Sequence, residues 1–141
     1  ITRLQNMGTP DYLISAACQL VVAQRLARKN CKKCKIPDDD VNPKVLQDLG
    51  FSAEQASRVK AIKGKGCETC SNTGYKGRQG IYEILVVSKP LKEAILRKAT
   101  TPELRQIAVK EGFQTMQDMG KRLIASGDLN FREYERVLSN E

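Results

Sequence analysis

Apolar residues recur at helical spacing through the second half of the chain. From Ser88 onward they fall three and four residues apart in successive stretches, which is the period of helices that bury one face. Thr100 with Glu103 has the spacing of a capping box, and Asn130 with Glu133 occupies capping positions. We therefore predict that three or four short helices close the chain. The residues expected to face inward are Leu91, Ala94, Ile95, Leu104, Ile107, Ala108, Met116, Met119, Gly120, Leu123, Ile124, Phe131, Tyr134 and Leu138.

Two further short helices are predicted in the middle of the chain. Asn42 is a candidate N-cap, Pro43 follows at the first helical position, and Gly50 supplies a stop. Ser52 and Gln55 then have the spacing of a capping box. Such a pair of helices could carry the chain out and back. The apolar residues assigned to them are Val45, Leu46, Leu49, Phe51 and Ala56.

Two other segments favour strands. The run RQGIYEILVV, residues 78–87, is rich in β-branched and aromatic residues and gives the clearest strand signal. In residues 13–29 the first half suits a helix, whereas the alternation in the second half is compatible with a strand. We predict an antiparallel hairpin of these two strands, in which Gly74, Gly77 and Gly80 form the turn into the second strand.

Composition narrows the class of protein. The 141 residues are 40% hydrophobic and 28% charged, as in a soluble globular domain or two small modules. No apolar run approaches the roughly 20 residues that span a bilayer, and no signal-peptide pattern opens the chain. The opening sequence ITRLQNMGTP lacks an initiator Met and leads directly into amphipathic sequence. We expect a segment of a longer protein.

Four of the five cysteines form two CxxC pairs with 32 residues between them. A disulfide framework would suit a secreted chain, and a thioredoxin-type pair would leave the second CxxC unexplained. Two chelating turns can instead complete one tetrahedral site, and the absence of His excludes mixed Cys/His sites. The spacing predicts structural Zn²⁺ held by Cys31, Cys34, Cys67 and Cys70. Cys18 is expected to be a small buried residue.

The formal charge of +8 raises the alternative of a nucleic-acid-binding, zinc-ribbon-like module. Zinc held by four thiolates carries a net charge of about −2, and neighbouring ammonium groups stabilise that anion. Low aromatic content also argues against a base-stacking surface. We therefore expect no nucleic-acid partner. The lysines near the cysteines are Lys29, Lys32, Lys33, Lys35, Lys63, Lys65 and Lys76.

The sequence offers no catalytic constellation. Without His, neither a Ser-His-Asp nor a Cys-His arrangement can form. The spaced glycines at 74–80 do not match a phosphate-binding loop. The acidic run Asp38–Asp40 is interpreted as solvated charge near a helix N-terminus. No catalytic or cofactor-binding residue is assigned, and the segment alone is not expected to be an enzyme.

Four stretches together resemble the C-terminal part of the type II/IV secretion ATPases. They are nearest to the type IV pilus assembly (extension) ATPases and next to their type II secretion relatives. CETCSNTG is also similar to a DnaJ-type chaperone module, but Asn72 stands where that repeat has Gly. The four stretches are TRLQNMG, AQRLARKNCKKCK, GCETCSNTGYKGRQGIYEILVV and GFQTMQDMGKRLIASGDLNFREYERVL.

The resemblance implies a cytoplasmic homohexamer, peripheral to the bacterial inner membrane, whose RecA-like core hydrolyses ATP with Mg²⁺. Its expected partners are its own other subunits and an inner-membrane platform protein, without direct membrane insertion. The four CxxC cysteines match the family's zinc ligands, whereas Gln24 and Arg25 match a family stretch without an assigned role. Walker A, Walker B, Asp-box and His-box motifs have no counterpart here, so ATP and Mg²⁺ would belong to the parent protein alone.

The expected architecture is an α+β fold in three segments. Residues 1–30 would form the C-terminal edge of the RecA-like core, as a helix plus a strand. Residues 31–78 would form the tetracysteine zinc module with two short helices, inserted at the tip of a short antiparallel hairpin. Residues 79–141 would supply the return strand and the helical region. The expected function is the zinc-containing segment of a hexameric ATPase that powers type IV pilus assembly, or alternatively type II secretion.

Overall fold

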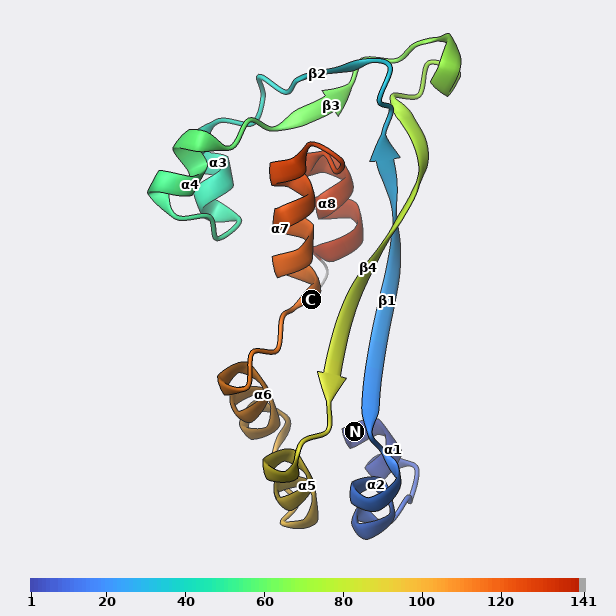
Figure 1. Ribbon diagram of the computed structural model, residues 1–141, viewed down its shortest axis with the longest axis vertical. Helices are drawn as coiled ribbons and strands as arrows, with labels where there is room; N and C mark the ends of the chain where they lie inside the picture. The colour runs from blue at the N-terminus through green and yellow to red at the C-terminus, as the bar shows by residue number, and fades with distance from the viewer. Residues whose placement is uncertain (140–141) are drawn as a thin grey trace. The chain divides into compact units, whose positions relative to one another are not determined.

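The computed structural model describes residues 1–139 (Figure 1), so residues 140–141 of the predicted last segment lie outside the described residues. Helices and strands alternate irregularly along the chain, as expected for an α+β fold. In chain order they are α1 (Thr2–Asn6), α2 (Asp11–Ala17), β1 (Leu20–Asn30), β2 (Lys35–Pro37), α3 (Pro43–Asp48), α4 (Ala53–Arg58), β3 (Ile62–Gly64), the 3₁₀ helix η1 (Glu68–Cys70), β4 (Tyr75–Val86), α5 (Lys89–Leu96), α6 (Thr101–Lys110), α7 (Met116–Ser126) and α8 (Phe131–Leu138).

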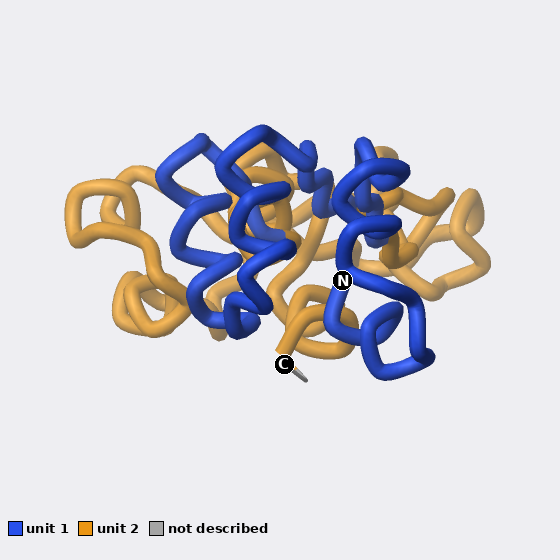
Figure 2. Tube along the Cα trace, turned by 90° about the horizontal axis from the view of Figure 1, so that it is seen from below, with its two compact units in different colours: residues 1–23, 82–115 blue, residues 24–81, 116–141 orange. Residues whose placement is uncertain are grey.

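The chain divides into two compact units, distinguished by colour in Figure 2. Unit 1 contains residues 1–23 and 82–115, and unit 2 contains residues 24–81 together with the chain from Met116 onward. These units differ from the three expected segments. Helices α7 and α8, grouped in the sequence with the return strand, belong to the same unit as the cysteine pairs.

Strands β1 and β4 form a two-stranded antiparallel sheet. At one end the Val87 N–H donates to the Gln19 carbonyl (2.9 Å), and at the other the Cys31 N–H donates to the Gly74 carbonyl (2.8 Å). The hairpin and its insertion are confirmed, but the predicted glycine turn is wrong. Strand β4 already begins at Tyr75, so two of the three glycines lie inside the strand. Gly77 is accommodated there with a φ of +81°, a left-handed conformation that Gly adopts without strain.

Unit 1 packs α2, α5 and α6 around a small aliphatic core. Of the residues predicted to face inward here, all but Ile107, which is half-buried, are fully buried. Cys18 packs half-buried against this core, in line with its expected role as a small apolar residue. The core consists of Ile14, Val87, Leu91, Ala94, Ile95, Ala99 and Leu104.

Unit 2 joins the inserted helices to the last two helices through one core. Both predicted caps of the inserted helices are confirmed: Asn42 Oδ1 accepts from Val45 N (3.0 Å), and Ser52 forms the complete capping box with Gln55. Phe131, predicted to be buried, is partly exposed. The core contains Ala27, Leu46, Phe51, Ala56, Ile81, Met116, Ile124, Leu129, Tyr134, Val137 and Leu138.

A second, shorter sheet in unit 2 carries the chain towards the cysteines. Strands β2 and β3 pair antiparallel, with Lys35 opposite Gly64 and Pro37 opposite Ile62. The chain enters β2 directly after Cys34, and it leaves β3 shortly before Cys67. The pairing therefore brings the two CxxC turns together although 32 residues separate them in sequence.

None of the helices described for residues 1–139 has the length and apolar character needed to cross a bilayer.

Candidate metal centre

The structure brings the Cys31, Cys34, Cys67 and Cys70 sulfurs together, within 4.8 Å of one another. The Sγ–Sγ distances are 3.8 Å from Cys31 to Cys67, 3.9 Å from Cys34 to Cys70, and 3.7 Å from Cys67 to Cys70. Zinc–sulfur bonds of about 2.3 Å in a tetrahedron place sulfurs about 3.8 Å apart. All four are free thiols. The four side chains are thus placed to hold one metal ion.

Backbone hydrogen bonds lock the two CxxC turns to each other. The Cys31 N–H donates to the Gly74 carbonyl (2.8 Å), and the Lys65 N–H donates to the Cys34 carbonyl (2.9 Å). Each bond runs from one turn to a residue flanking the other. Cys31 and Cys70 are buried, with 1% and 5% of their surface exposed. The geometry is therefore fixed by the fold around the sulfurs.

Three backbone N–H groups point at the sulfurs, and they control which thiol ionises most readily. Burial raises the pKa of Cys34 to about 11, although the Gly66 N–H at 3.3 Å opposes this. Burial acts in the same direction on Cys70, but the N–H groups of Cys67 and Gly74, both at 3.2 Å, lower its pKa to about 6. Cys70 is therefore the readier of these two thiols to bind a cation as a thiolate, and metal binding must displace a proton from Cys34.

Some of the nearby basic residues are neutralised by carboxylates. Lys35 Nζ lies 3.4 Å from Asp128 Oδ1, and Lys63 Nζ lies 3.2 Å from Asp38 Oδ1 and 3.7 Å from Asp40 Oδ2. The Asp38 side chain is only 12% exposed, so the interpretation of residues 38–40 as purely solvated charge is wrong for its first member. Four other lysines of the predicted group are solvent exposed: Lys32, Lys33, Lys65 and Lys76.

Asn30, which immediately precedes the first cysteine of the cluster, is 1% exposed, and its side-chain amide makes three hydrogen bonds. Its Nδ2 donates to the carbonyls of Ile62 and Gly127, each at 3.0 Å, while its backbone N–H donates to the Asp128 carbonyl (2.9 Å). Its Oδ1 accepts from Asn130 Nδ2 (3.1 Å). No local sequence pattern indicates this role, because every partner is more than 30 residues away.

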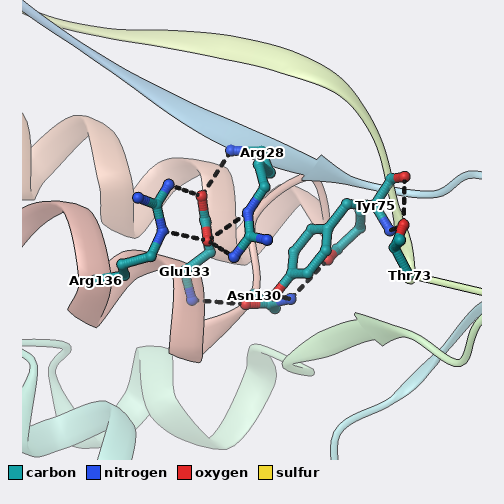
Figure 3. Close-up of polar contacts among 7 residues, drawn as sticks. Arg28, Thr73, Tyr75, Asn130, Glu133 and Arg136 are labelled. Atoms are coloured by element: carbon teal, nitrogen blue, oxygen red, sulfur yellow. Dashed lines mark hydrogen bonds and ion pairs between the residues drawn. The ribbon is translucent and has the colours of Figure 1, made fainter.

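Beside this pair, Glu133 is completely buried and accepts from two arginines (Figure 3). The sequence predicts a capping position for Glu133 in α8. Asn130 does cap the helix by accepting from Glu133 N (2.8 Å), but the Glu133 carboxylate binds Arg28 N and Nη2 (both 2.8 Å) and Arg136 Nε (2.9 Å). Burial alone would raise the pKa of Glu133; the hydrogen bonds from Arg136 and Arg28 outweigh it and lower the pKa to about 2. Arg28 also stacks 4.1 Å above the Tyr75 ring.

Arg25 of the AQRL stretch also contacts α8, because its Nη1 donates to the Val137 carbonyl. Figure 3 shows Thr73 beside Tyr75, where the threonine hydroxyl bonds both the backbone N–H and the carbonyl of Tyr75. These contacts anchor the strands that lead to the sulfurs. They indicate that these polar residues position the strands and do not take part in chemistry.

Comparisons with known proteins agree across the chain. A family model described as type II/IV secretion system protein matches residues 1–136. The type IV pilus assembly ATPase PilB of Thermus thermophilus is 40% identical over 85% of this chain and 13% of that protein. PilB of Myxococcus xanthus is 34% identical over 94% and 24%. The type II secretion system protein HxcR of Pseudomonas aeruginosa is 31% identical over 97% and 25%. The chain therefore spans a quarter or less of the length of these relatives.

Proposed function

The chain belongs to the type II/IV secretion system protein family, and from that membership we propose that it is the metal-binding C-terminal segment of an ATPase that powers type IV pilus assembly. The observation that carries the proposal is the match of pilus assembly ATPases across nearly the whole chain, including the region of the four converging thiols. The same segment of a type II secretion ATPase is the second candidate, because relatives of that name match a similar share of the chain.

The ion proposed for the four thiols is Zn²⁺. An all-cysteine tetrahedral set suits zinc or iron. The sulfur separations of 3.7–3.9 Å fit a single ion, whereas an iron–sulfur cluster needs room for several atoms between its ligands. With four thiolates the coordination sphere is closed, so the ion would stabilise the fold and would not activate water.

The parent protein is proposed to be a homohexamer that binds ATP and Mg²⁺ in a RecA-like core, on the cytoplasmic side of the inner membrane. Residues 1–30 would form the edge of that core. This part of the proposal is supported by the apolar side chains that β1 and β4 expose in unit 1, since an isolated domain would normally bury such a face. These side chains are Leu20, Val22, Ile84 and Val86, each 51–63% exposed.

The metal centre is proposed to act as a rigid contact point. The β1–β4 hairpin would transmit motion of the ATPase core to the segment that carries the four cysteines. That segment would in turn transmit it to the platform protein or to a neighbouring subunit. The exposed lysines beside the two CxxC turns would provide the contact, because an acidic partner surface is attracted to such a cluster.

The test replaces Lys32, Lys33 and Lys65 by glutamate in the full-length ATPase. The control makes the same lysine-to-glutamate replacement at Lys89 and Lys110, which are exposed on α5 and α6. We expect the first variant to lose most pilus extension while its zinc content, its ATP hydrolysis in the absence of partners and its thermal stability stay unchanged. Normal extension would refute the contact role. Salt-sensitive binding of the wild-type chain to duplex DNA or RNA would favour the nucleic-acid alternative instead.

A further inference from the structure

We infer that the α7–α8 loop, residues 127–130, positions the metal centre, so that metal binding and the docking of α7 and α8 are energetically coupled. All the residues concerned lie in unit 2. The inference needs only a metal bound by the four thiols, and it holds whichever secretion system the parent protein serves.

Four chain segments lead into and out of the sulfur cluster. Asn30 precedes the first cysteine, Lys35 follows the second, Ile62 lies on the strand that leads to the third, and Tyr75 follows the fourth by five residues. Asn30, Lys35 and Tyr75 contact the loop at 127–130 directly. Ile62 lies beside Gly127 and is linked to it through Asn30 Nδ2, which donates to both carbonyls. A single short loop therefore reaches every backbone segment that sets the sulfur positions.

Asn30 makes the most extensive of these contacts. Its backbone N–H and one Nδ2 hydrogen bond reach the carbonyls of Asp128 and Gly127, at 2.9 and 3.0 Å, and its Oδ1 accepts from Asn130. The remaining Nδ2 hydrogen bond reaches the Ile62 carbonyl on β3 (3.0 Å). Because the side chain is buried, each lost partner would leave a polar group without solvent compensation.

Asn130 continues the same network to the fourth segment. Its Nδ2 donates both to Asn30 Oδ1 (3.1 Å) and to the Tyr75 hydroxyl (3.0 Å), and the side chain is 6% exposed. Tyr75 directly follows Gly74, whose N–H donates to Cys70 Sγ and whose carbonyl accepts from Cys31 N. Movement of Asn130 would thus reach the first CxxC turn through Asn30, the neighbour of Cys31, and the second through Tyr75 and Gly74.

Gly127 allows the loop to approach this closely. It has a φ of +79°, and a Cβ at this position would lie 3.3 Å from Ile62 Cγ1 and 3.7 Å from Lys35 Nζ. The Lys35 ammonium also pairs with Asp128 (3.4 Å). The loop therefore lies close beside Ile62 of β3, where a side chain at residue 127 would be crowded, and it is ion-paired to β2 and hydrogen bonded to β1.

Thermodynamic linkage means that the coupling can be measured either as a change in metal affinity or as a change in the stability of the docked loop. If the docked loop raises the affinity of the thiols for metal, bound metal must stabilise the docked loop by the same free energy. Residues outside the direct ligand shell that orient ligands typically change metal affinity about 10- to 100-fold when they are replaced.

The first experiment compares two serine substitutions in the zinc-loaded full chain. Asn130→Ser keeps an oxygen able to cap α8 but removes both Nδ2 hydrogen bonds. Asn42→Ser makes the same substitution at the N-cap of α3, where the Asn42 side chain accepts from Val45 N. Competition with a chromophoric chelator measures zinc affinity, and the Co²⁺-substituted proteins report thiolate geometry by their charge-transfer absorption. We expect about a tenfold or greater loss of zinc affinity and an altered Co²⁺ spectrum for Asn130→Ser only. Equal affinities of the two variants would overturn the inference.

The second experiment needs no variant, so it remains decisive if Asn130→Ser fails to fold. Amide hydrogen exchange of the wild-type chain is compared with zinc bound and after chelation. We expect the amides of Asp128 and Leu129 to lose protection when zinc is removed, while amides of α5 in unit 1 keep theirs. Unchanged protection at 128–129 would show that the loop docks independently of the metal, contrary to the inference.

Discussion

The backbones of Gly64 and Gly74 touch. A Cβ on Gly64 would stand 1.9 Å from the Gly74 carbonyl oxygen, and a Cβ on Gly74 would stand 2.5 Å from the Gly64 carbonyl oxygen. Gly64 ends β3 on the way to Cys67, and Gly74 lies between Cys70 and β4. The segments on either side of the second CxxC turn thus cross at a point where only hydrogen atoms fit.

We predict that Gly64→Ala will separate these segments. The added methyl group meets backbone, which cannot move aside as a side chain can, so the destabilisation should exceed the 1–3 kcal/mol typical of overpacking. Zinc affinity should fall as well. Chemical denaturation and chelator competition provide the measurements. Gly77→Ala is the control: its Cβ has no neighbour within 4 Å, so it should lose only the roughly 1–2 kcal/mol of its left-handed backbone.

A second prediction concerns acid stability. The folded-state pKa of Glu133 is about 2, below its ordinary value of 4.5, so the charged carboxylate stabilises the folded chain by about 3 kcal/mol above pH 4.5. This contribution declines as the pH falls from about 4.5 towards 2. Glu133→Gln should therefore be less stable than wild type at pH 7, and the difference should shrink through this pH window.

The measurement for Glu133 is the difference in unfolding free energy between the two proteins at each pH. Acid also releases zinc, but the cysteines are the same in both proteins, so this effect cancels in the difference. A difference that stays constant from pH 7 to pH 2 would mean that the Arg28 and Arg136 interactions do not depend on the carboxylate charge.

The third prediction separates the four clustered cysteines from the fifth. Cys31→Ser should reduce the zinc content to well below one equivalent and lower the unfolding free energy by at least about 4 kcal/mol under zinc-saturating conditions. Cys18→Ser should retain full zinc, because Cys18 packs in unit 1. Elemental analysis and chelator-dependent thermal unfolding test both. Full zinc in Cys31→Ser would remove this residue from the ligand set.

The fourth prediction tests the crossing of the last two helices. A Cβ on Gly120 of α7 would lie 2.5 Å from Leu138 Cδ1 and 2.7 Å from Tyr134 Cε2. Gly120→Ala should therefore destabilise the chain by about 1–3 kcal/mol through overpacking, although Ala favours an isolated helix by about 1 kcal/mol. Urea denaturation measures the change. Higher stability of the variant would indicate that α8 can shift at little cost.

Features governed by neighbouring residues could be predicted from the sequence. The Asn42 and Ser52 caps act over three residues, so their residue types suffice to locate α3 and α4. The convergence of the four cysteines could also be inferred, because two CxxC pairs in one chain are typical of a single four-cysteine metal site. The buried stripes of α5 and α6 likewise follow from helical periodicity.

Features that depend on distant partners could not be predicted. Glu133 has the spacing of a local cap, yet it binds Arg28, 105 residues away. Gly77 has the residue type of a turn, yet pairing with β1 keeps it inside β4. In both cases the local pattern was compatible with two structures, and only the register of strands and helices in three dimensions selects between them.

The contacts of Asn30 can form only late in synthesis of the chain. Its partners Gly127 and Asn130 lie 97 and 100 residues later in the chain. At about 5–20 residues per second, a ribosome adds them roughly 5–20 seconds after Asn30. All four thiols are added during that interval, before the residues that hold them in place. The nascent polypeptide therefore presents them to oxidants and to competing soft metals until translation reaches its final helices.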